Sequence, residues 1–370
     1  MKLTPATLAV LLTASCTAIP PAGGPGPRAG GAIRLHDGWT IRPAGRAVVV
    51  GTFPMAIAPL PGARAAVLLC GFAEEGIDVV DLAHGTRRRL PMPKAWLGLA
   101  ASSDGKTLYA SGGADNVVRV FEERSGEWTE TQPFQLGREG DAIFPAGIAI
   151  DESHERLYAA ENLAGRVAEL DLRSRKLLRE YPVGNAPYEV RVDPAGGRLF
   201  VSNWGGGSVS EVLLDGSGTT RTWSAGSHPT ALLFEPSSGR LLVACAGDDR
   251  VTALDVSSGA PVWNASMTLR AGDPEGTTPT SLVRAPDGRS LVACSNNNDL
   301  AVLDDRGERP RVDGFLPVGR YPTAVAVAGD TILVADGKGS VTRAAPDGPQ
   351  PTDRIRGSRQ PGYVLARQTG

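Results

Sequence analysis

The sequence repeats itself with a period of 42 to 50 residues. Seven segments share one pattern, in which a proline or an aromatic residue is followed by an alternating strand, a turn, a second strand, a turn and a third strand. They begin at Pro54, Trp96, Pro145, Pro187, Pro229, Pro279 and Pro322. A strand-only period of this length is typical of β-propeller blades, because one sheet buries its faces only against neighbouring sheets. We therefore predict an all-β fold, a seven-bladed β-propeller of four-stranded antiparallel blades.

Closure of the ring needs a strand from each end of the chain. Residues 41–50 are strand-like and precede the first repeat, so we expect this N-terminal strand to close the last blade as its outer strand and to remove an exposed edge. After Val341 the repeat pattern fails. The last blade is therefore expected to be irregular or incomplete, and one alternative is that the chain is a shortened copy of a longer product.

The N-terminus has the pattern of an export signal. Lys2 is followed by a short apolar stretch at residues 8–12 and by Thr-Ala-Ser before Cys16. The apolar stretch is too short to span a bilayer as a helix, which favours a cleaved signal. We assign residues 1–16 to this signal, 17–33 to a flexible Pro/Gly/Ala tether and 34–370 to the propeller. Lipidation at Cys16, which would tether the protein to a bacterial membrane, and ordinary secretion to the periplasm both remain open.

The charge balance narrows the choice of partners, and the positions of the cysteines indicate whether disulfides form. With 38 basic and 40 acidic residues the net charge is −2, so no nucleic-acid partner is expected. Cys70 and Cys294 fall in a column of small residues in the second strand of each repeat, and Cys245 lies one residue beyond that column. We interpret the column as buried small side chains, and we expect no disulfide, because equivalent positions on different blades point around the ring.

The repeats resemble those of the YVTN-type propellers, a group that includes YncE-like and lactonase-like seven-bladed proteins. The resemblance rests on SSDGKTLYASGGADNVVRV (102–120), GGRLFVSNWGGGSVSEV (196–212) and PVGRYPTAVAV (317–327). It extends from about residue 40 to 341 and implies the fold more strongly than any activity. The chain is also similar to the propeller half of propeller–phosphoesterase proteins, so a truncated form of such a protein is one alternative.

Propellers carry functional groups at the mouth of the central channel, on loops that join one blade to the next. The candidate ligand-binding residues are those beside the repeat starts and those after the second strand: Trp96, Glu161, Tyr188, Asn203, Trp204, His228, Tyr321 and Asp336. Aromatic rings at a channel mouth suit a sugar, a peptide or a cofactor, and oxygen donors suit Ca²⁺ or Mg²⁺. The alternatives are that the aromatic residues plug the gaps between blades and that the polar side chains cap turns.

The sequence contains little that would support a catalytic, metal or cofactor site. The four histidines, His36, His84, His154 and His228, have no zinc-site spacing. There is no Gly-x-Ser-x-Gly elbow, no phosphate-binding loop and no Cys-x-x-Cys-His haem motif. We assign no catalytic residue, metal or cofactor.

The expected function is that of an exported, non-catalytic propeller, monomeric, which binds a protein or a small-molecule ligand at its channel mouth. The alternative implied by the resemblance is a lactonase-like hydrolase that acts on a cyclic ester or sugar acid through an acid such as Glu161 or Asp336. The question of whether the protein is an enzyme therefore stays open, with the non-catalytic reading preferred.

Overall fold

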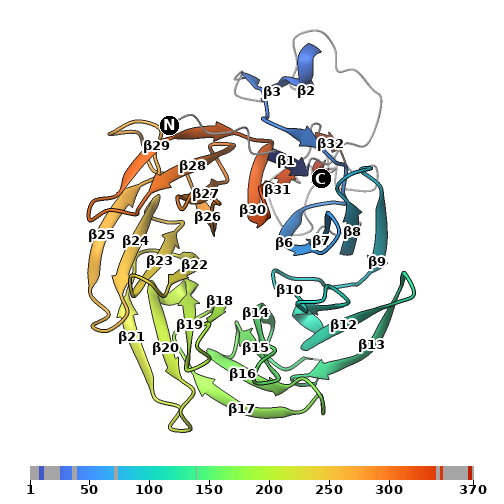
Figure 1. Ribbon diagram of the computed structural model, residues 1–370, viewed down its shortest axis with the longest axis vertical. Coiled ribbons are helices and arrows are strands. Elements are labelled where there is room, and N and C mark those ends of the chain that lie inside the picture. Colours follow the sequence, from blue (N-terminus) through green and yellow to red (C-terminus); the bar gives the residue numbers. More distant parts are fainter. Residues whose placement is uncertain are drawn as a thin grey trace, which may run out of the picture.

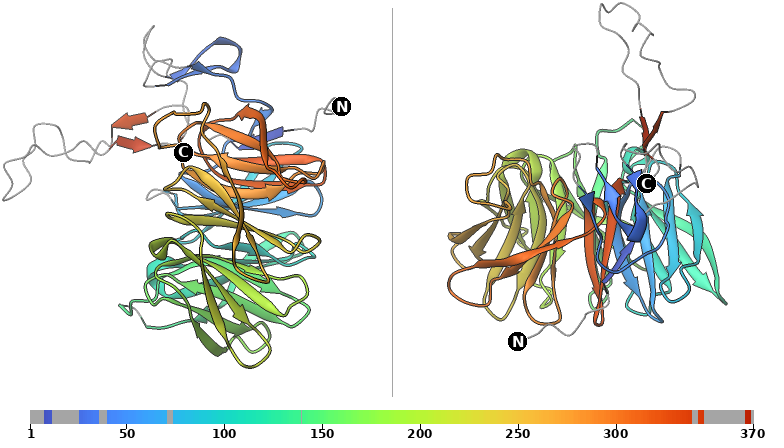
Figure 2. Two further views of the ribbon diagram at one scale, coloured as in Figure 1. Left: turned by 90° about the vertical axis from the view of Figure 1, so that its left-hand side faces the viewer. Right: turned by 90° about the horizontal axis from the view of Figure 1, so that it is seen from above.

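The computed structural model describes residues 8–11, 26–35, 40–70, 74–138, 140–338, 342–344 and 366–368. Sheets are arranged radially around a central axis, like blades (Figure 1), and the ring is a thick disc when seen from the side (Figure 2). Among the described elements the only helical ones are three 3-10 turns, η1 (Ala29–Gly31), η2 (Gly113–Asp115) and η3 (Trp204–Gly206). The predicted all-β propeller is therefore confirmed.

Six blades consist of four consecutive antiparallel strands each. The first three are β6 (Pro54–Leu60), β7 (Arg64–Leu69), β8 (Gly76–Asp81) and β9 (Arg87–Pro91); β10 (Leu99–Ala101), β11 (Thr107–Ser111), β12 (Val117–Arg124) and β13 (Glu127–Gln135); and β14 (Pro145–Asp151), β15 (Arg156–Glu161), β16 (Arg166–Asp171) and β17 (Leu177–Pro182). The next three are β18 (Pro187–Val192), β19 (Arg198–Asn203), β20 (Ser208–Leu213) and β21 (Thr220–Ser224); β22 (Pro229–Glu235), β23 (Arg240–Cys245), β24 (Arg250–Asp255) and β25 (Pro261–Ser266); and β26 (Pro279–Arg284), β27 (Ser290–Cys294), β28 (Asp299–Asp304) and β29 (Arg311–Pro317).

The expectation of seven such blades is wrong, since the described residues form six. Between β26 and β6 the ring is completed by a mixed sheet in the order β30–β31–β1–β5, which we call the last sheet. It contains β30 (Arg320–Ala328), β31 (Thr331–Lys338), β1 (Leu8–Leu11) and β5 (Arg46–Ala47). β1 runs parallel to both β31 and β5, so only the β30–β31 hairpin has the regular antiparallel pairing.

The last sheet departs from a regular blade because of how its strands are supplied by the chain. The seventh repeat supplies two strands, and its next described strand, β32 (Thr342–Ala344), pairs with β33 (Ala366–Gln368) rather than with β31. The third and fourth places are therefore taken by short N-terminal strands. The N-terminal stretch 41–50 does reach the outer edge of this sheet, but only as β5.

The N-terminal segment forms a small sheet of its own. β2 (Gly26–Pro27), β3 (Ile33–Arg34) and β4 (Thr40–Ile41) pair antiparallel beside the last sheet (Figure 1). β2 and η1 lie within the segment that the sequence assigns to a tether, and β1 lies within the segment assigned to a signal. Cys16 is outside the described residues, so cleavage and lipidation stay predictions.

Each blade has two ends that differ in what they connect. At one end the inner strand begins, the second strand ends and the third strand begins. In the third blade these three positions are Pro145, Glu161 and Arg166, which lie side by side in the sheet. This end carries the connections between blades, and we call it the mouth end. The opposite end carries the turns from first to second and from third to fourth strand, and we call it the turn end.

Neighbouring sheets are held together by apolar clusters and by hydroxyl groups. An apolar cluster fills each interface around the ring, with fully buried side chains such as Leu68, Phe134 and Phe200. At the mouth end, inner-strand hydroxyls donate to the first carbonyl of the next sheet, as Thr230 does to Pro279 (3.0 Å). The same bond closes the ring, from Thr323 to Pro54 (2.5 Å).

Strand register corrects one detail of the predicted small-residue column. Leu69 and Cys294, like Glu161 in the third blade, are opposite the first proline of the inner strand. Cys294 therefore lies one place beyond the column, and Cys70 two places beyond it. Cys294 and Cys245 are buried, Cys70 is partly buried, and all three are free thiols. Burial raises the pKa of Cys70 to about 12 and that of Cys245 to about 11, so neither is a ready nucleophile.

Candidate functional site

A cavity of about 260 Å³ lies where the seven inner strands meet around the axis. Every inner strand contributes to its wall, from β6 to β30, which form the inner edge of the ring (Figure 1). The two sides of the wall differ in chemistry. The first three blades contribute apolar groups such as Met55, Leu99 and Ile148, whereas β18 to β30 contribute hydroxyls and charges. The channel is therefore amphipathic and suits a ligand with one apolar side.

One residue at or near the start of each inner strand has a left-handed backbone conformation. These residues are Phe53 (φ 50°), Leu97 (54°), Phe144 (54°), Ala186 (50°), His228 (51°), Thr278 (57°) and Tyr321 (61°). Side chains other than glycine rarely adopt this conformation, and such positions cluster at binding sites. In five of the sheets, all but those of Leu97 and Tyr321, the carbonyl of this residue accepts from a main-chain N–H just after the second strand, as that of Phe53 does from Cys70 (3.0 Å). The fold thus fixes one side chain per sheet at the mouth.

Two charged residues lie in the polar wall of the channel. Glu189 pairs with Arg191 through Oε1 and Nη2 (2.6 Å), and its Oε2 accepts a hydrogen bond from the Leu232 N–H (2.9 Å). Their side chains are 20% and 51% exposed. Burial raises the pKa of Glu189, and the charge of Arg191 partly opposes that rise. The pair offers a ligand a carboxylate and a guanidinium close together.

Aromatic side chains border the same cavity. Tyr188 and Tyr321, both predicted from the sequence, lie in its wall with Phe53, and the rings of Phe53 and Tyr321 stack with centroids 6.4 Å apart. Burial and the nearby Glu189 raise the pKa of Tyr188, so its hydroxyl stays protonated at neutral pH. Trp96 makes a T-shaped contact with Phe144 (5.6 Å) between the second and third blades, as expected for a plug between sheets.

Exposed apolar and aromatic side chains lie at the mouth end of consecutive blades. Trp204 is 41% exposed and makes a tilted ring contact with the exposed His228, with ring centroids 4.2 Å apart. Leu163 (62% exposed) lies on the third blade and Leu269 (41% exposed) on the connection to the sixth. We call Leu163, Trp204, His228 and Leu269 the rim strip. The structure thus brings together Trp204 and His228, both predicted candidates.

The three predicted oxygen donors do not converge. Glu161, Asn203 and Asp336 are all fully buried, each within its own sheet. Glu161 pairs with Arg166. Asn203 binds Ser208, Ser210 and the Gly184 N–H within the fourth blade and its connection. Both oxygens of Asp336 lack a hydrogen-bond partner among the described atoms. The described residues contain no group of three or more potential metal ligands.

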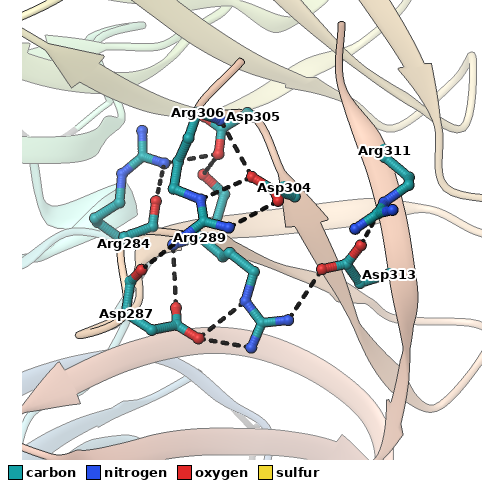
Figure 3. Close-up of polar contacts among 10 residues, drawn as sticks. Arg284, Asp287, Arg289, Asp304, Asp305, Arg306, Arg311 and Asp313 are labelled. Atoms are coloured by element: carbon teal, nitrogen blue, oxygen red, sulfur yellow. Dashed lines mark hydrogen bonds and ion pairs between the residues drawn. The ribbon is translucent and has the colours of Figure 1, made fainter. Parts of the chain in front are cut away.

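Charges at the turn end of the sixth blade form a cluster of a different kind (Figure 3). Arg289 pairs with Asp287 (2.6 Å) and Asp313 (3.1 Å), and Arg284 pairs with Asp305 (2.7 Å). Arg306 and Arg311 each have an aspartate partner as well. Because the charges neutralise one another, this cluster stabilises turns and does not resemble a ligand site.

Sequence reasoning missed Glu189 and Arg191, although a signal was present. Two residues after the inner-strand proline the other blades have small side chains: Ala56, Gly147, Ala231, Ser281 and Ala324. Glu189 is the charged exception in this column. At Gly147 a Cβ would lie only 2.4 Å from the Tyr188 carbonyl oxygen, so the column is small because adjacent inner strands approach closely. An acid placed there faces the channel.

Comparisons with known proteins agree with the fold. A family profile described as "Outer membrane protein assembly factor BamB" matches residues 191–350, less than half of the chain. No curated protein matches the chain. None of the described segments forms a helix of the length and apolarity needed to cross a bilayer.

Solved propeller structures superimpose on most of the chain. Virginiamycin B lyase from Staphylococcus aureus has 16% identity and a TM-score of 0.62, covering 77% of this chain and 92% of its own. A Lactobacillus plantarum protein has 13% identity and a TM-score of 0.63 (79% and 93%). Hydrazine synthase from Kuenenia stuttgartiensis has 17% identity and a TM-score of 0.60 (76% and 92%). At these identities the likeness concerns the fold alone, and the narrower resemblance to YVTN-type propellers stays a prediction.

Proposed function

We propose that this chain is an exported, non-catalytic propeller that binds a peptide segment of a partner protein at the mouth end of its channel. The observation that carries the proposal is the rim strip, three large apolar or aromatic side chains exposed on neighbouring blades, with the His228 ring in tilted contact with Trp204. The contact between Trp204 and His228 makes these two rings one exposed patch, and such patches mark interaction sites, whereas single exposed side chains do not. His228 is two residues from Thr230, which lines the channel, so strip and cavity adjoin.

The channel wall supports a peptide as the ligand. A peptide places apolar side chains on one side of its backbone and amide groups along it. Met55, Leu99 and Ile148 suit the side chains, while the Glu189–Arg191 pair offers an acceptor and a donor to the backbone or to a charged terminus. The description of the matching family profile, an assembly factor, also favours a protein partner.

Selection from a random-peptide display library, with the immobilised full chain as bait, tests this proposal. We expect enriched peptides whose affinity falls at least about tenfold on Trp204→Ala, because buried aromatic anchors dominate peptide binding. The matched control is Val262→Ala, which removes a side chain of similar exposure (45%) from the outer strand β25. Peptides that bind the Trp204→Ala variant as tightly as the wild type would contradict the proposal.

The alternative function is a hydrolase or lyase that acts on a cyclic ester. One of the similar folds is a virginiamycin B lyase that was solved with quinupristin. Glu161 and Asp336 are buried, so the acid open to the cavity is Glu189. Turnover of quinupristin or of a lactone panel by the wild type, lost in Glu189→Gln, would replace the binding proposal by this one. We expect no turnover.

Export also belongs to the proposal and has its own test. Metabolic labelling with a fatty acid, followed by fractionation of the cells, is expected to place the protein outside the cytoplasm, with or without label. Loss of the label in Cys16→Ala would establish the lipoprotein form, and an unlabelled, shortened exported chain would establish simple secretion. A full-length chain retained in the cytoplasm would contradict export.

A further inference from the structure

We propose that the mouth end of the last sheet holds a second binding site, which takes an oxyanion group such as a phosphate or a carboxylate. The site is a cavity of about 210 Å³ between the β27–β28 turn and the β30–β31 hairpin. Asn296 and Asn298 line it on one side, Arg320 and Lys338 on the other. This inference is independent of the peptide-binding proposal, because the two sites share only Tyr321, which borders both cavities.

The charge of the pocket comes from two cations on one face of the sheet. Arg320 and Lys338 are directly opposite each other in the antiparallel β30–β31 pair. Side chains at such positions lie on the same face, and like charges there destabilise the sheet. An anion bound beside Lys338 would be attracted by both positive charges, so the placement favours an anionic ligand.

Lys338 is held in place without a carboxylate. Its ammonium lies 4.0 Å from the centroid of the Tyr321 ring, a cation–π contact. Burial and the charge of Arg320 lower the pKa of Lys338. No described carboxylate pairs with it, in contrast to the arginines of the turn end, each of which has an aspartate partner. Its charge is therefore available to a ligand.

The facing turn adds neutral hydrogen-bond donors. Asn298 is oriented by the Tyr321 N–H, which donates to its Oδ1 (3.0 Å), and its Nδ2 makes only a long bond to the Asn296 carbonyl (3.4 Å). Asn296 donates one Nδ2 hydrogen to Thr278 (2.8 Å) and keeps the other, since an amide nitrogen carries two. Two cations and two amides on opposite walls match the several acceptor lone pairs of an oxyanion.

The small number of lysines makes a direct test possible. The chain contains five, Lys2, Lys94, Lys106, Lys176 and Lys338. Reductive methylation with ¹³C-labelled formaldehyde keeps their positive charge and gives each a methyl resonance, and Lys338→Arg assigns the one of interest. Inorganic phosphate and acetate are titrated separately, with sodium chloride at matched ionic strength as reference.

We expect a saturable shift of the Lys338 resonance with phosphate, with acetate or with both, and no such shift of Lys106, which lies in a turn at the other end of the second blade. Which anion binds more tightly distinguishes a phosphate from a carboxylate ligand. Equal movement of all lysine resonances, or a response to sodium chloride as large as that to either anion, would overturn the proposal.

Variants distinguish anion binding in this pocket from a general electrostatic effect of the protein's positive charges. Arg320→Gln is expected to weaken anion binding about tenfold, and Asn296→Ala, on an exposed turn, about threefold. The matched control is Arg311→Gln at the turn end, for which binding should not change. Wild-type positions of the Lys106 and Lys176 resonances report that each variant is folded. If Arg320→Gln does not fold, Asn296→Ala decides alone, and unchanged binding in that variant contradicts the site.

Discussion

Buried aspartates at the two ends of the propeller have different surroundings. At the turn end, Asp305 (3% exposed side chain) accepts from Arg284 at 2.7 Å and from the Ser290 hydroxyl at 3.1 Å. At the mouth end, one oxygen of the buried Asp299 and both oxygens of Asp336 lack a hydrogen-bond partner among the described atoms. A buried polar group without a partner costs stability, and such groups are retained mainly where a protein binds or reacts. Of these three acids, the one at the turn end is therefore satisfied within the fold, whereas the two at the mouth end keep oxygens without a partner among the described atoms.

The difference has a local cause in the sequence. At the turn end an acid and an arginine are two residues apart, as in Asp287 with Arg289 and Asp304 with Arg306, so each charge meets its partner within one short turn. At the mouth end, Asp299 has no basic residue at this spacing, because Asn297 and Ala301 occupy the positions two residues away.

The largest expected effect is a pH dependence caused by Asp299. Burial raises its pKa from 3.8 to about 7. A carboxyl whose pKa is higher in the folded state is most favourable when protonated, so its contribution is intact below about pH 4, is lost as the pH rises towards 7 and changes no further above it. The loss amounts to about 4 kcal/mol at most, at roughly 1.4 kcal/mol per pH unit.

Denaturant unfolding of the wild type and of Asp299→Asn between pH 4 and 8 measures this loss. The variant should show a flatter dependence, and its stability relative to the wild type should rise with pH. The raised pKa of Asp336 acts in the same direction in both proteins and cancels in the comparison. Parallel pH profiles would show that Asp299 has found a partner, and the contrast between the two ends would then be weaker.

The second largest expected effect comes from breaking an ion pair at the turn end. Arg284→Met leaves Asp305 buried without its cation and also removes the link to Glu235 on the fifth blade (3.0 Å). We expect the free energy of unfolding to fall by about 3 kcal/mol, as for other broken buried pairs. Arg311→Met is the control within the same cluster, since its side chain is 75% exposed, and should cost no more than about 0.5 kcal/mol. Equal costs would mean that the cluster is not a buried structural element.

Removing the hydroxyl group that closes the ring should have a smaller effect on stability. The same change in a regular blade allows the last sheet to be compared with it. Thr323→Val leaves the Pro54 carbonyl without its buried donor, and Thr230→Val does the same to Pro279. Each should lower the free energy of unfolding by about 1–2 kcal/mol. A much smaller cost for Thr323→Val in denaturant unfolding would indicate that the mixed sheet closes the ring less tightly than the regular blades do.

These contrasts also explain how far the sequence could be interpreted. The repeat predicted the blades and their inner-strand starts, because alternation and turn residues are local. It placed Tyr188, Trp204, His228 and Tyr321 at the mouth for the same reason. It could not place the third strand of the last sheet, because a parallel pairing between residues 8–11 and β31 has no local signal.

The oxygen donors show the same limit. Glu161 and Asn203 end their strands and Asp336 lies near the end of β31, which suggested exposure, but all three are fully buried. Arg320 and Lys338 are 18 residues apart and become neighbours only through the register of the β30–β31 hairpin. Properties that depend on contacts between sheets were therefore beyond the sequence.

The smallest expected effect has the opposite sign at the two ends. Removing a cation from the turn end costs stability, whereas Lys338→Met at the mouth end removes a like charge from beside Arg320 and relieves burial of the ammonium. We expect the variant to be more stable than the wild type by about 0.5 kcal/mol at low salt, and the gain to shrink as added sodium chloride screens the repulsion. Urea unfolding at two salt concentrations measures this. Phosphate should stabilise the wild type more than the variant, because only the wild type keeps both cations. A variant that is less stable at low salt would mean that the Tyr321 contact outweighs the repulsion, and Lys338 would then serve the fold, as the arginines of the turn end do.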